Sequence, residues 1–427
     1  MKYYSTKSKN NPVSFAKAAL TGLAPDGGLY IPGDIPKLDS TVISSLADMK
    51  YIDVAFETIK HWVKEDIPSG VLEEMLISSY PFDAPVVEAA GRYVLELFHG
   101  PTAAFKDFGA RFMARAFSYL RRGEDKPLTI LTATSGDTGG AVADGFFGIE
   151  GISVIVLYPK GRISPLQEKQ IAGLGNNISA LAVEGSFDDC QRLVKQAFQD
   201  QDLQKKFNLA SANSINVSRL IPQIVYYVAA SGRVHKPLFS VPSGNFGNLT
   251  AGLYAFKMGA PIHRFIAATN INKTIPDYLE TGSYLEQLSK ATLSNAMDVG
   301  APSNFERINA HFSWEELKEI VLGMYVSDEE TRQTIKEVFS NGYCLDPHSA
   351  VGWQAVTKLK HKGVLSNEKS IEKPVIVSTA HPAKFGETLE ELGIQVALPA
   401  SLEKAMQRTA QSKTIKAEFA DLKAELC

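Results

Sequence analysis

The 427-residue sequence is poor in several features that would assign it to a specialised class of protein. It has only three cysteines, Cys190, Cys344 and Cys427, and they form no CxxC pair, so a disulfide scaffold is excluded and a reducing compartment is favoured. Basic residues are not in excess: Lys+Arg 44 against Asp+Glu 47 gives a formal net charge of -3, which disfavours nucleic acid and anionic membranes as partners. No apolar run approaches the roughly 18 residues of a membrane helix, and the N-terminal segment has no signal-peptide pattern. We therefore expect a cytoplasmic protein with no membrane partner.

Common metal-binding and catalytic motifs are also missing. His99, His348 and His381 have no HExxH or similar ligand spacing, so we interpret them as hydrogen-bonded polar residues and expect no metal site. The sequence has no GxSxG segment that would predict a serine hydrolase. It also lacks the Gly-Lys-Ser/Thr run of P-loop proteins, so any phosphate-binding loop is of another kind.

The composition and the order of apolar segments predict the fold class. Hydrophobic residues at 44% and charged residues at 21% are typical of a globular protein, with length for about two to three domains. Residues 1–85 predict a small N-terminal domain. Beyond it, apolar strands alternate with Gly-rich turns and amphipathic helices, which predicts an α/β fold of two lobes with mostly parallel sheets covered by helices. We assign residues 86–125 and 213–427 to a large lobe and residues 126–212 to a smaller one.

Ligands of open α/β sheets bind beyond the carboxyl ends of the strands. The loops that follow Thr134, Val241 and Thr379 come directly after apolar strands, so we expect the functional site there. The charged C-terminal segment 401–427 is instead typical of a solvated amphipathic helix on the surface.

The segment His99–Gly109 contains the most informative lysine. Thr102 is a favourable N-cap, and Phe105 and Phe108 share one face of the helix that it predicts, so Lys106 lies in the first turns among aromatic neighbours. Burial and the positive end of a helix dipole both lower a lysine pKa. Lys106 is therefore a candidate for a neutral amine that condenses with an aldehyde, the alternative being an ordinary solvated lysine.

Two glycine-rich loops and one polar segment are candidate anion sites. Val241–Thr250 links a strand to a helix, and its glycines allow backbone N–H groups to converge on a phosphate, although an ordinary turn is an equal alternative. Thr134–Gly140 has the same construction, with hydroxyl groups suited to a carboxylate or a second phosphate. In Asn213–Arg219, the Arg219 guanidinium could bind a phosphate through two N–H donors, but the residues alone favour a polar loop with a salt-bridged arginine.

Taken together, six segments resemble those of the threonine synthases, a branch of the fold-type II pyridoxal phosphate enzymes. The resemblance runs over nearly the whole chain, and the segments follow in the order of the family: Gly22–Pro32, His99–Gly109, Thr132–Gly139, Asn213–Arg219, Pro242–Asn248 and Ser378–Lys384. It implies the two-lobed fold of type II, pyridoxal 5'-phosphate as cofactor, and a small-molecule substrate. The large lobe would bind the cofactor, and the smaller lobe would carry the loop for the substrate carboxylate.

The resemblance also implies a role for each matching residue. Lys106 would hold the cofactor as a Schiff base and move the protons of the reaction, Asp137 would contact the cofactor ring oxygen, and Thr379 would face the pyridine nitrogen. Many fold-type II relatives carry Asn at the position of Asp137. The cofactor phosphate would be held by Gly244, Asn245, Phe246, Gly247 and Asn248. The substrate would be bound at its carboxylate by Thr134 and Ser135, and at its phosphate by Thr138, Asn213, Ser214 and Arg219.

The implied reaction is the last step of threonine biosynthesis: O-phospho-L-homoserine and water give L-threonine and phosphate by γ-elimination and β-addition of water. One alternative is a pyridoxal phosphate-dependent dehydratase or phospho-lyase on a hydroxy- or phospho-amino acid, and another is a catalytically silent carrier of the cofactor. The Arg219 group disfavours a dehydratase, which has no substrate phosphate to bind, and Lys106 disfavours the carrier. Glycosylation sequons at Asn216 and Asn248 would fall in the site of a secreted protein, which again favours the cytoplasm. The oligomeric state, monomer or dimer, is left open.

Overall fold

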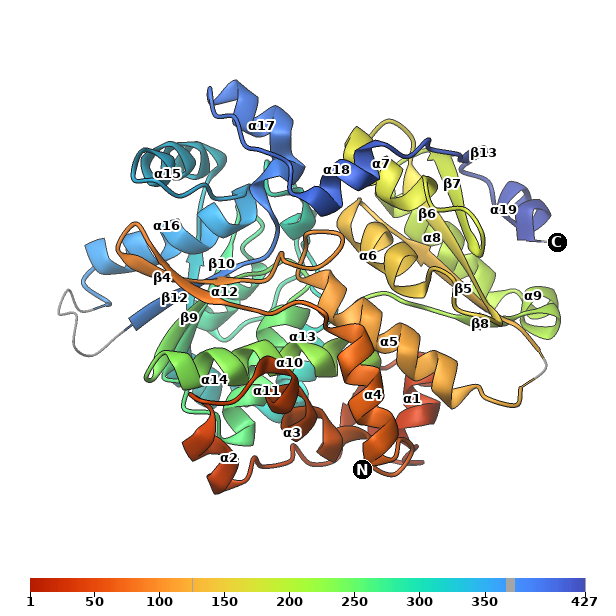
Figure 1. Ribbon diagram of the computed structural model, residues 1–427, viewed down its shortest axis with the longest axis horizontal. Helices are drawn as coiled ribbons and strands as arrows, with labels where there is room; N and C mark the ends of the chain where they lie inside the picture. The colour runs from red at the N-terminus through yellow and green to blue at the C-terminus, as the bar shows by residue number, and fades with distance from the viewer. Residues whose placement is uncertain (125, 366–372, 427) are drawn as a thin grey trace.

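The computed structural model of the chain describes residues 1–124, 126–365 and 373–426, so Cys427 lies outside the described residues. Figure 1 shows two α/β lobes side by side, with the N-terminal helices packed below them. The expected architecture of two helix-covered sheets, mostly parallel, with a separate N-terminal region is confirmed. In the described part of the chain, no helix has the length and the hydropathy to cross a membrane.

The N-terminal region packs on the larger lobe through aromatic residues. Its elements are β1 (Tyr3–Ser5), α1 (Phe15–Thr21), β2 (Tyr30–Pro32), α2 (Ser40–Ser45), α3 (Tyr51–Val63) and α4 (Ser69–Ser79), with β1 and β2 antiparallel. Trp62 of α3 is fully buried, and its ring stacks on that of Tyr254 with 5.8 Å between centroids. The Tyr80 hydroxyl donates a hydrogen bond of 3.1 Å to the carbonyl of Phe108. The region therefore supports the helices that carry the site.

The larger lobe is built on a sheet of six strands. Their spatial order is β11 (Val321–Tyr325), β10 (Arg264–Thr269), β9 (Pro237–Pro242), β12 (Lys373–Ser378), β4 (Arg92–Glu96) and β3 (Val86–Ala89), and only β3 and β4 pair antiparallel. Every residue of β9 is buried, as expected for a strand with helices on both faces. The helices are α5 (Lys106–Leu120), α10 (Val217–Arg233), α11 (Gly247–Met258), α12 (Thr274–Thr281), α13 (Phe305–His311), α14 (Trp314–Ile320), α15 (Asp328–Ser340), α16 (Pro347–His361) and α17 (Gly386–Glu391), with 3-10 turns η1 (Asn295–Met297) and η2 (Pro382–Phe385).

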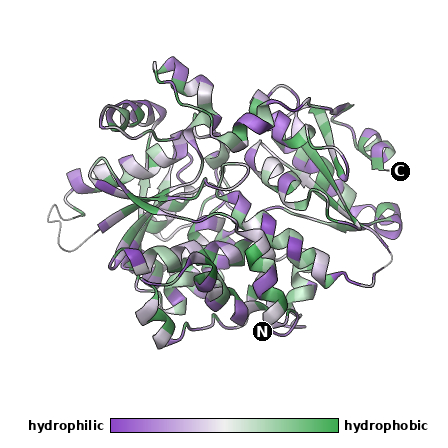
Figure 2. Cartoon of the chain, in the orientation of Figure 1, coloured by the Kyte–Doolittle hydropathy of each residue, from purple (hydrophilic) through white to green (hydrophobic). Residues whose placement is uncertain are grey.

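The smaller lobe is built on a parallel sheet of five strands. Their spatial order is β13 (Lys413–Lys416), β7 (Ile178–Glu184), β6 (Ile152–Pro159), β5 (Leu128–Ala133) and β8 (Asn208–Ala210). Its helices are α6 (Asp137–Phe146), α7 (Pro165–Ala172), α8 (Phe187–Gln199) and α9 (Gln201–Lys206). Figure 2 shows these strands largely in green, whereas α15 on the outside of the larger lobe is largely purple, so the apolar residues line the interior.

The C-terminal segment differs from the prediction of one surface helix over 401–427. It forms α18 (Ala400–Met406), then β13, then α19 (Phe419–Leu426), and β13 pairs in parallel with β7. The prediction is wrong because β13 has a single apolar residue, the buried Ile415, and its partner strand lies far away in the sequence. We keep the division into an N-terminal region and two lobes as a proposal, with residues 413–426 moved to the smaller lobe.

Candidate active site

A cavity of about 1040 Å³ opens where strands β5, β9 and β12 end. Its walls come from both lobes, and they include every residue that the sequence predicts for the site. The three loops after Thr134, Val241 and Thr379 thus face one space. Their individual roles stay predictions, and the geometry below shows what each side chain can do.

Lys106 is fixed at the cavity by contacts of the backbone that precedes it. The N–H of Phe105 donates to the carbonyl of Thr379 at 2.9 Å, and the N–H of His381 donates to the carbonyl of Ala103 at 3.0 Å. These bonds hold the start of α5 against the end of β12. Lys106 is the first residue of α5, so it lies at the positive end of the helix dipole.

The prediction that Thr102 caps α5 is wrong. Phe105 occupies the N-cap position without a side-chain hydrogen bond, and Thr102 instead donates to the buried carboxylate of Asp107, through its hydroxyl at 2.5 Å and its N–H at 2.9 Å. Burial raises the pKa of Asp107 to about 6, against the opposing effect of these hydrogen bonds. The turn before Lys106 is therefore closed by Asp107 and not by a capping threonine.

The Lys106 amine lies in surroundings that favour its neutral form. Its side chain is 15% exposed, and Nζ lies 3.7 Å from Oδ2 of Asp137 and 4.6 Å from the centre of the Phe105 ring. Burial lowers the pKa of Lys106, and the charges of Lys384 and Arg219 lower it further, although Asp137 raises it. The net lowering makes an unprotonated amine more available to an aldehyde.

The loop before α11 forms a compact cradle for an anion. Phe246 has a left-handed backbone with φ of +59°, and a Cβ added at Gly244 would lie 2.7 Å from the Cα of Met297, so glycine is required at that approach. The first N–H groups of a helix have no partner within the helix. Those of α11 therefore remain available to a phosphate.

Asn248 adds a side-chain donor to this cradle. Its Oδ1 accepts hydrogen bonds from the hydroxyls of Tyr226 at 2.6 Å and Tyr227 at 2.8 Å, which fixes the orientation of the amide. Its Nδ2 is buried and has no hydrogen-bond partner among the described residues, and the same holds for the hydroxyl of Ser243. Two buried polar groups without partners at a helix N-terminus fit the phosphate of a cofactor.

Asn245 connects the cradle to the second predicted anion segment. Its Nδ2 donates to the Ser214 hydroxyl at 2.7 Å, and its Oδ1 accepts from the N–H of Ser303 at 2.6 Å. Asn213 is fixed as well, because the Thr132 hydroxyl donates to its Oδ1 at 2.6 Å. The two segments therefore share one wall of the cavity.

Arg219 places a buried cation at this wall. One of its terminal nitrogens donates to the carbonyl of Ala212 at 2.7 Å, and its Nε has no partner in the described structure. Burial lowers the pKa of the guanidinium to about 10, with Asp107 opposing, so the group stays charged at neutral pH. The alternative of a polar loop with a salt-bridged arginine does not apply, because Arg219 lies in α10, lines the cavity and makes no ion pair among the described residues.

The loop at the start of α6 is arranged around Thr134. Its hydroxyl accepts hydrogen bonds from the N–H groups of Gly136 at 2.9 Å and Gly139 at 2.8 Å, so it shapes the loop. Ser135 and Thr138 are partly exposed and line the cavity. Their hydroxyls are the free polar groups that this loop offers to a substrate.

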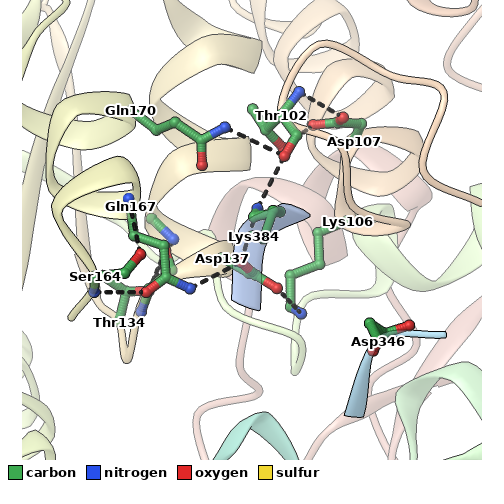
Figure 3. A network of polar contacts seen from close by, with 12 residues as sticks. Thr102, Lys106, Asp107, Thr134, Asp137, Ser164, Gln167, Gln170, Asp346 and Lys384 are labelled. Atoms are coloured by element: carbon green, nitrogen blue, oxygen red, sulfur yellow. Dashed lines mark hydrogen bonds and ion pairs between the residues drawn. The ribbon is translucent and has the colours of Figure 1, made fainter. Parts of the chain in front are cut away.

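Asp137 in the same loop is held by groups from both lobes, as Figure 3 shows. Oδ1 accepts a hydrogen bond of 3.0 Å from Gln167 and pairs with Lys384 Nζ at 2.8 Å. Burial alone would raise the pKa of Asp137, but the charges of Lys384 and then Lys106 outweigh it and lower the pKa well below the usual range. Asp137 is therefore a carboxylate.

Several residues of the site had no signal in the sequence. Tyr226 and Tyr227 look like ordinary helix residues. Gln167 meets Asp137 through the packing of α7 on α6 within the smaller lobe, and Lys384 meets it across the lobes. His348 also lines the cavity, and its Nδ1 lies 3.0 Å from Asp346 Oδ1, in line with the prediction of a hydrogen-bonded histidine.

Both the sequence and the fold are similar to those of known proteins. The family model "Pyridoxal-phosphate dependent enzyme" matches residues 86–378, "Threonine synthase N terminus" matches 2–80, and "Threonine synthase, C-terminal" matches 349–425. The chain is 44% identical to threonine synthase of Escherichia coli over 433 residues, which cover 99% of this chain and 98% of that protein. The crystal structure of the Escherichia coli protein gives a TM-score of 0.91 at 43% identity, covering 100% of this chain and 99% of the other. The crystal structure of PLP-bound threonine synthase from Brucella melitensis gives 0.91 at 35% identity, covering 100% and 98%.

Proposed function

The chain belongs to the threonine synthase family of pyridoxal phosphate-dependent enzymes, and from this premise we propose that its cavity converts O-phospho-L-homoserine and water into L-threonine and phosphate. The reaction is a carbon–oxygen lyase reaction on a phosphate ester. One observation carries the proposal: Lys106 shares a cavity with two separate anion-binding groups, around Asn248 and around Arg219. A cofactor and a substrate that each bear a phosphate need two such groups.

Pyridoxal phosphate, when bound, supplies an aldehyde that links to an amine and a ring that withdraws electrons from the Cα of an attached amino acid. We assign the link to Lys106 Nζ and the cofactor phosphate to the N–H groups of Gly244–Asn248 and to Asn248 Nδ2. Thr379 is assigned to the ring nitrogen, because its carbonyl accepts a hydrogen bond from the N–H of Phe105, the residue next to Lys106. Asp137 is assigned to the ring oxygen, because its carboxylate lies beside the Lys106 amine.

In the reaction, Lys106 Nζ is the group that moves protons at Cα, Cβ and Cγ of the substrate while phosphate leaves Cγ. The lowered pKa of Lys106 supports this role, since a base must be partly unprotonated at working pH. Arg219, together with Asn213, Ser214 and Thr138, holds the phosphate as it leaves. Water then adds at Cβ.

The substrate carboxylate is assigned to the loop that begins at Thr134. The Thr134 hydroxyl is used within the loop, so Thr134 acts by shaping it, and Ser135 together with the N-terminal N–H groups of α6 supplies the contacts. The carboxylate therefore lies on the smaller lobe, opposite the cofactor phosphate on the larger one.

Turnover in ¹⁸O-labelled water tests the proposal. We expect threonine with the label on its Cβ hydroxyl and unlabelled phosphate, because water adds to carbon and the phosphorus–oxygen bond stays intact. Labelled phosphate together with homoserine would contradict the proposal and indicate a phosphatase. A 2-keto acid without threonine would favour the dehydratase alternative. Since a keto group exchanges with water, the amino acid is isolated before the label is read.

We also propose that the enzyme acts in the cytoplasm, on a small molecule alone, without nucleic acid or membrane. Cys190 and Cys344 are free thiols, which supports a reducing compartment. The sequon residues Asn216 and Asn248 are 0% and 6% exposed, so the folded chain has no room for a glycan at either. Sedimentation of the purified protein would decide between monomer and dimer.

A further inference from the structure

A second buried lysine, Lys384 of η2, reaches the carboxylate that faces Lys106 (Figure 3). Its side chain is 0% exposed, and Nζ lies 2.8 Å from Oδ1 of Asp137 and donates a hydrogen bond of 2.8 Å to the carbonyl of Thr102. Lys106 Nζ lies 3.7 Å from the other oxygen, Oδ2. The two oxygens of Asp137 thus face two different lysines, and Lys384 is the nearer.

The difference in distance matters for the protonation of Lys106. A carboxylate beside a buried amine favours the ammonium form, and the interaction is strong where the dielectric constant is low. An ammonium cannot react with an aldehyde. Lys384 pairs with the other oxygen of Asp137 and so weakens the attraction of the carboxylate for an ammonium at Lys106. The charge of Lys384 also repels a proton on Lys106, so both contributions favour the neutral amine.

The other charged groups that face Lys106 do not replace Lys384. Arg219 of α10 adds a repulsive charge, but its guanidinium donates a hydrogen bond to the carbonyl of Ala212 and does not pair with Asp137. Gln167 of α7 donates a neutral hydrogen bond to Asp137. Lys384 is therefore the cation paired with Asp137 from the side away from the cavity.

We propose that Lys384 is a positioning residue that acts through Asp137 and keeps Lys106 available as a neutral amine for the cofactor aldehyde. The inference rests on the proposed role of Lys106 as the cofactor-binding lysine. It adds a second lysine to the site, one that touches neither cofactor nor substrate.

The rate at which the full-length, cofactor-free chain captures added pyridoxal phosphate tests the inference. The neutral amine adds to the aldehyde carbon and one water leaves; borohydride then fixes the bond, and mass spectrometry reads the peptide containing Lys106. The rate is followed from about pH 6 to about pH 10, so that its pH midpoint reports the protonation of Lys106. For Lys384→Met we expect the midpoint to rise by about one pH unit, which slows capture about tenfold near neutral pH.

Three further variants separate this role from a purely structural one. Asp137→Asn should lower the midpoint, because Lys384 then repels the proton on Lys106 without opposition. The double variant Lys384→Met/Asp137→Asn should return the midpoint close to that of the unmodified chain. Lys384→Arg keeps the charge and should keep the midpoint. If Lys384 only holds the surrounding backbone in place, Lys384→Met should capture the cofactor more slowly at every pH without a change of midpoint, and the double variant should not restore the rate.

Lys358→Met is the matched control, since Lys358 of α16 also pairs with a carboxylate, Glu330, at 2.7 Å, but outside the cavity wall. It should leave the midpoint unchanged. If Lys384→Met does not fold, Asp137→Asn decides, and an unmoved midpoint there overturns the inference. Cofactor trapped on another lysine would instead overturn the proposed role of Lys106, so the two failures are distinguishable.

Discussion

Two loops of the cavity have the same construction but differ in charge, since one is neutral and the other is negative. Gly244–Asn248 runs from the end of β9 into α11, and Thr134–Gly140 runs from the end of β5 into α6. The loop before α11 offers only neutral donors, whereas the loop before α6 carries a carboxylate, Asp137, at its first helical residue. A helix N-terminus favours one negative charge. In α11 that preference remains available to a phosphate, whereas in α6 the charge of Asp137 is paired with Lys384 and the helix end is left to the weaker charge of a carboxylate.

The two loops also differ in what holds them. The α11 loop is fixed within the larger lobe, by Tyr226 and Tyr227 and by the close approach of Gly244 to Met297. The α6 loop is tied across the lobes, through Asp137 to Lys384. We infer that the first loop is suited to a permanently bound cofactor and the second to a substrate that enters and leaves. The variants below test this contrast.

Lys106→Ala removes the amine that lies between the two loops and is expected to have the largest effect. We expect turnover to fall by roughly 10⁴-fold or more, because the base and the covalent link are lost together. Borohydride treatment should leave no cofactor on the chain, whereas the phosphate cradle should still bind the free cofactor reversibly, as measured by equilibrium dialysis. Covalent cofactor on a different lysine would contradict the assignment.

Asn248→Asp makes the α11 loop resemble the α6 loop by adding a carboxylate at the start of the helix. The side chain keeps an oxygen for Tyr226 and Tyr227 but loses the Nδ2 donor and repels a phosphate. We expect a cofactor affinity weaker by roughly 10³-fold, about 4 kcal/mol, from the lost charge-assisted hydrogen bond and the repulsion. Titration with pyridoxal phosphate measures it. An unchanged affinity would mean that the cofactor phosphate lies elsewhere.

Arg219→Ala should separate the substrate phosphate from the cofactor phosphate. Loss of a charge-assisted contact predicts a decrease in kcat/KM of about 100-fold, near 3 kcal/mol, with little change in cofactor affinity. Arg233→Ala is the control, because Arg233 lies in the last turn of the same helix α10 and pairs at the surface with Asp83. Loss of cofactor from Arg219→Ala with normal kinetics would show that the two phosphate sites are exchanged.

The sequence predicts the two loops themselves, because they follow from the local order of strands, turns and helices. Strands followed by glycine-rich turns predict the two loops, and the resemblance singles out Lys106 and Arg219. Charge partners could not be predicted, because Lys384 and Asp137 are far apart in the chain and meet only through the packing of the lobes. The strand β13 was missed for the same reason, since its pairing with β7 is a contact between distant segments.

Helix boundaries near the site show a second limit of local pattern. Thr102 has the right chemistry for an N-cap, but its hydroxyl bonds to the carboxylate of Asp107, and the helix begins later, at Lys106. Ala103, which follows Thr102, has a left-handed backbone with φ of +54°, so the helix cannot run through it, and the N–H of Phe105 donates to the carbonyl of Thr379. The backbone path between α5 and β12 thus overrides a local capping preference.

Tyr227→Phe should give the smallest effect and tests whether the α11 loop depends on the orientation of Asn248. The change removes one of the two hydroxyls that donate to Asn248 Oδ1 and leaves the other, from Tyr226, in place. One neutral hydrogen bond contributes about 1 kcal/mol, so cofactor affinity should weaken about fivefold. The substrate KM should not change, since Tyr227 contacts no residue of the α6 loop in the described hydrogen bonds.

Tyr278→Phe is the control for Tyr227→Phe, because the Tyr278 hydroxyl lies outside the cavity lining and, among the described residues, makes only a long hydrogen bond of 3.4 Å to Asn309. Equal effects of the two changes on cofactor affinity would remove the proposed role of Asn248 orientation. The double variant Tyr226→Phe/Tyr227→Phe sharpens the test. With both donors gone, the amide is free to rotate and present its oxygen to the phosphate, so the loss of affinity should exceed the sum of the two single losses. A strictly additive loss would mean that Asn248 keeps its orientation through other contacts and that the two tyrosines serve only to fill the core.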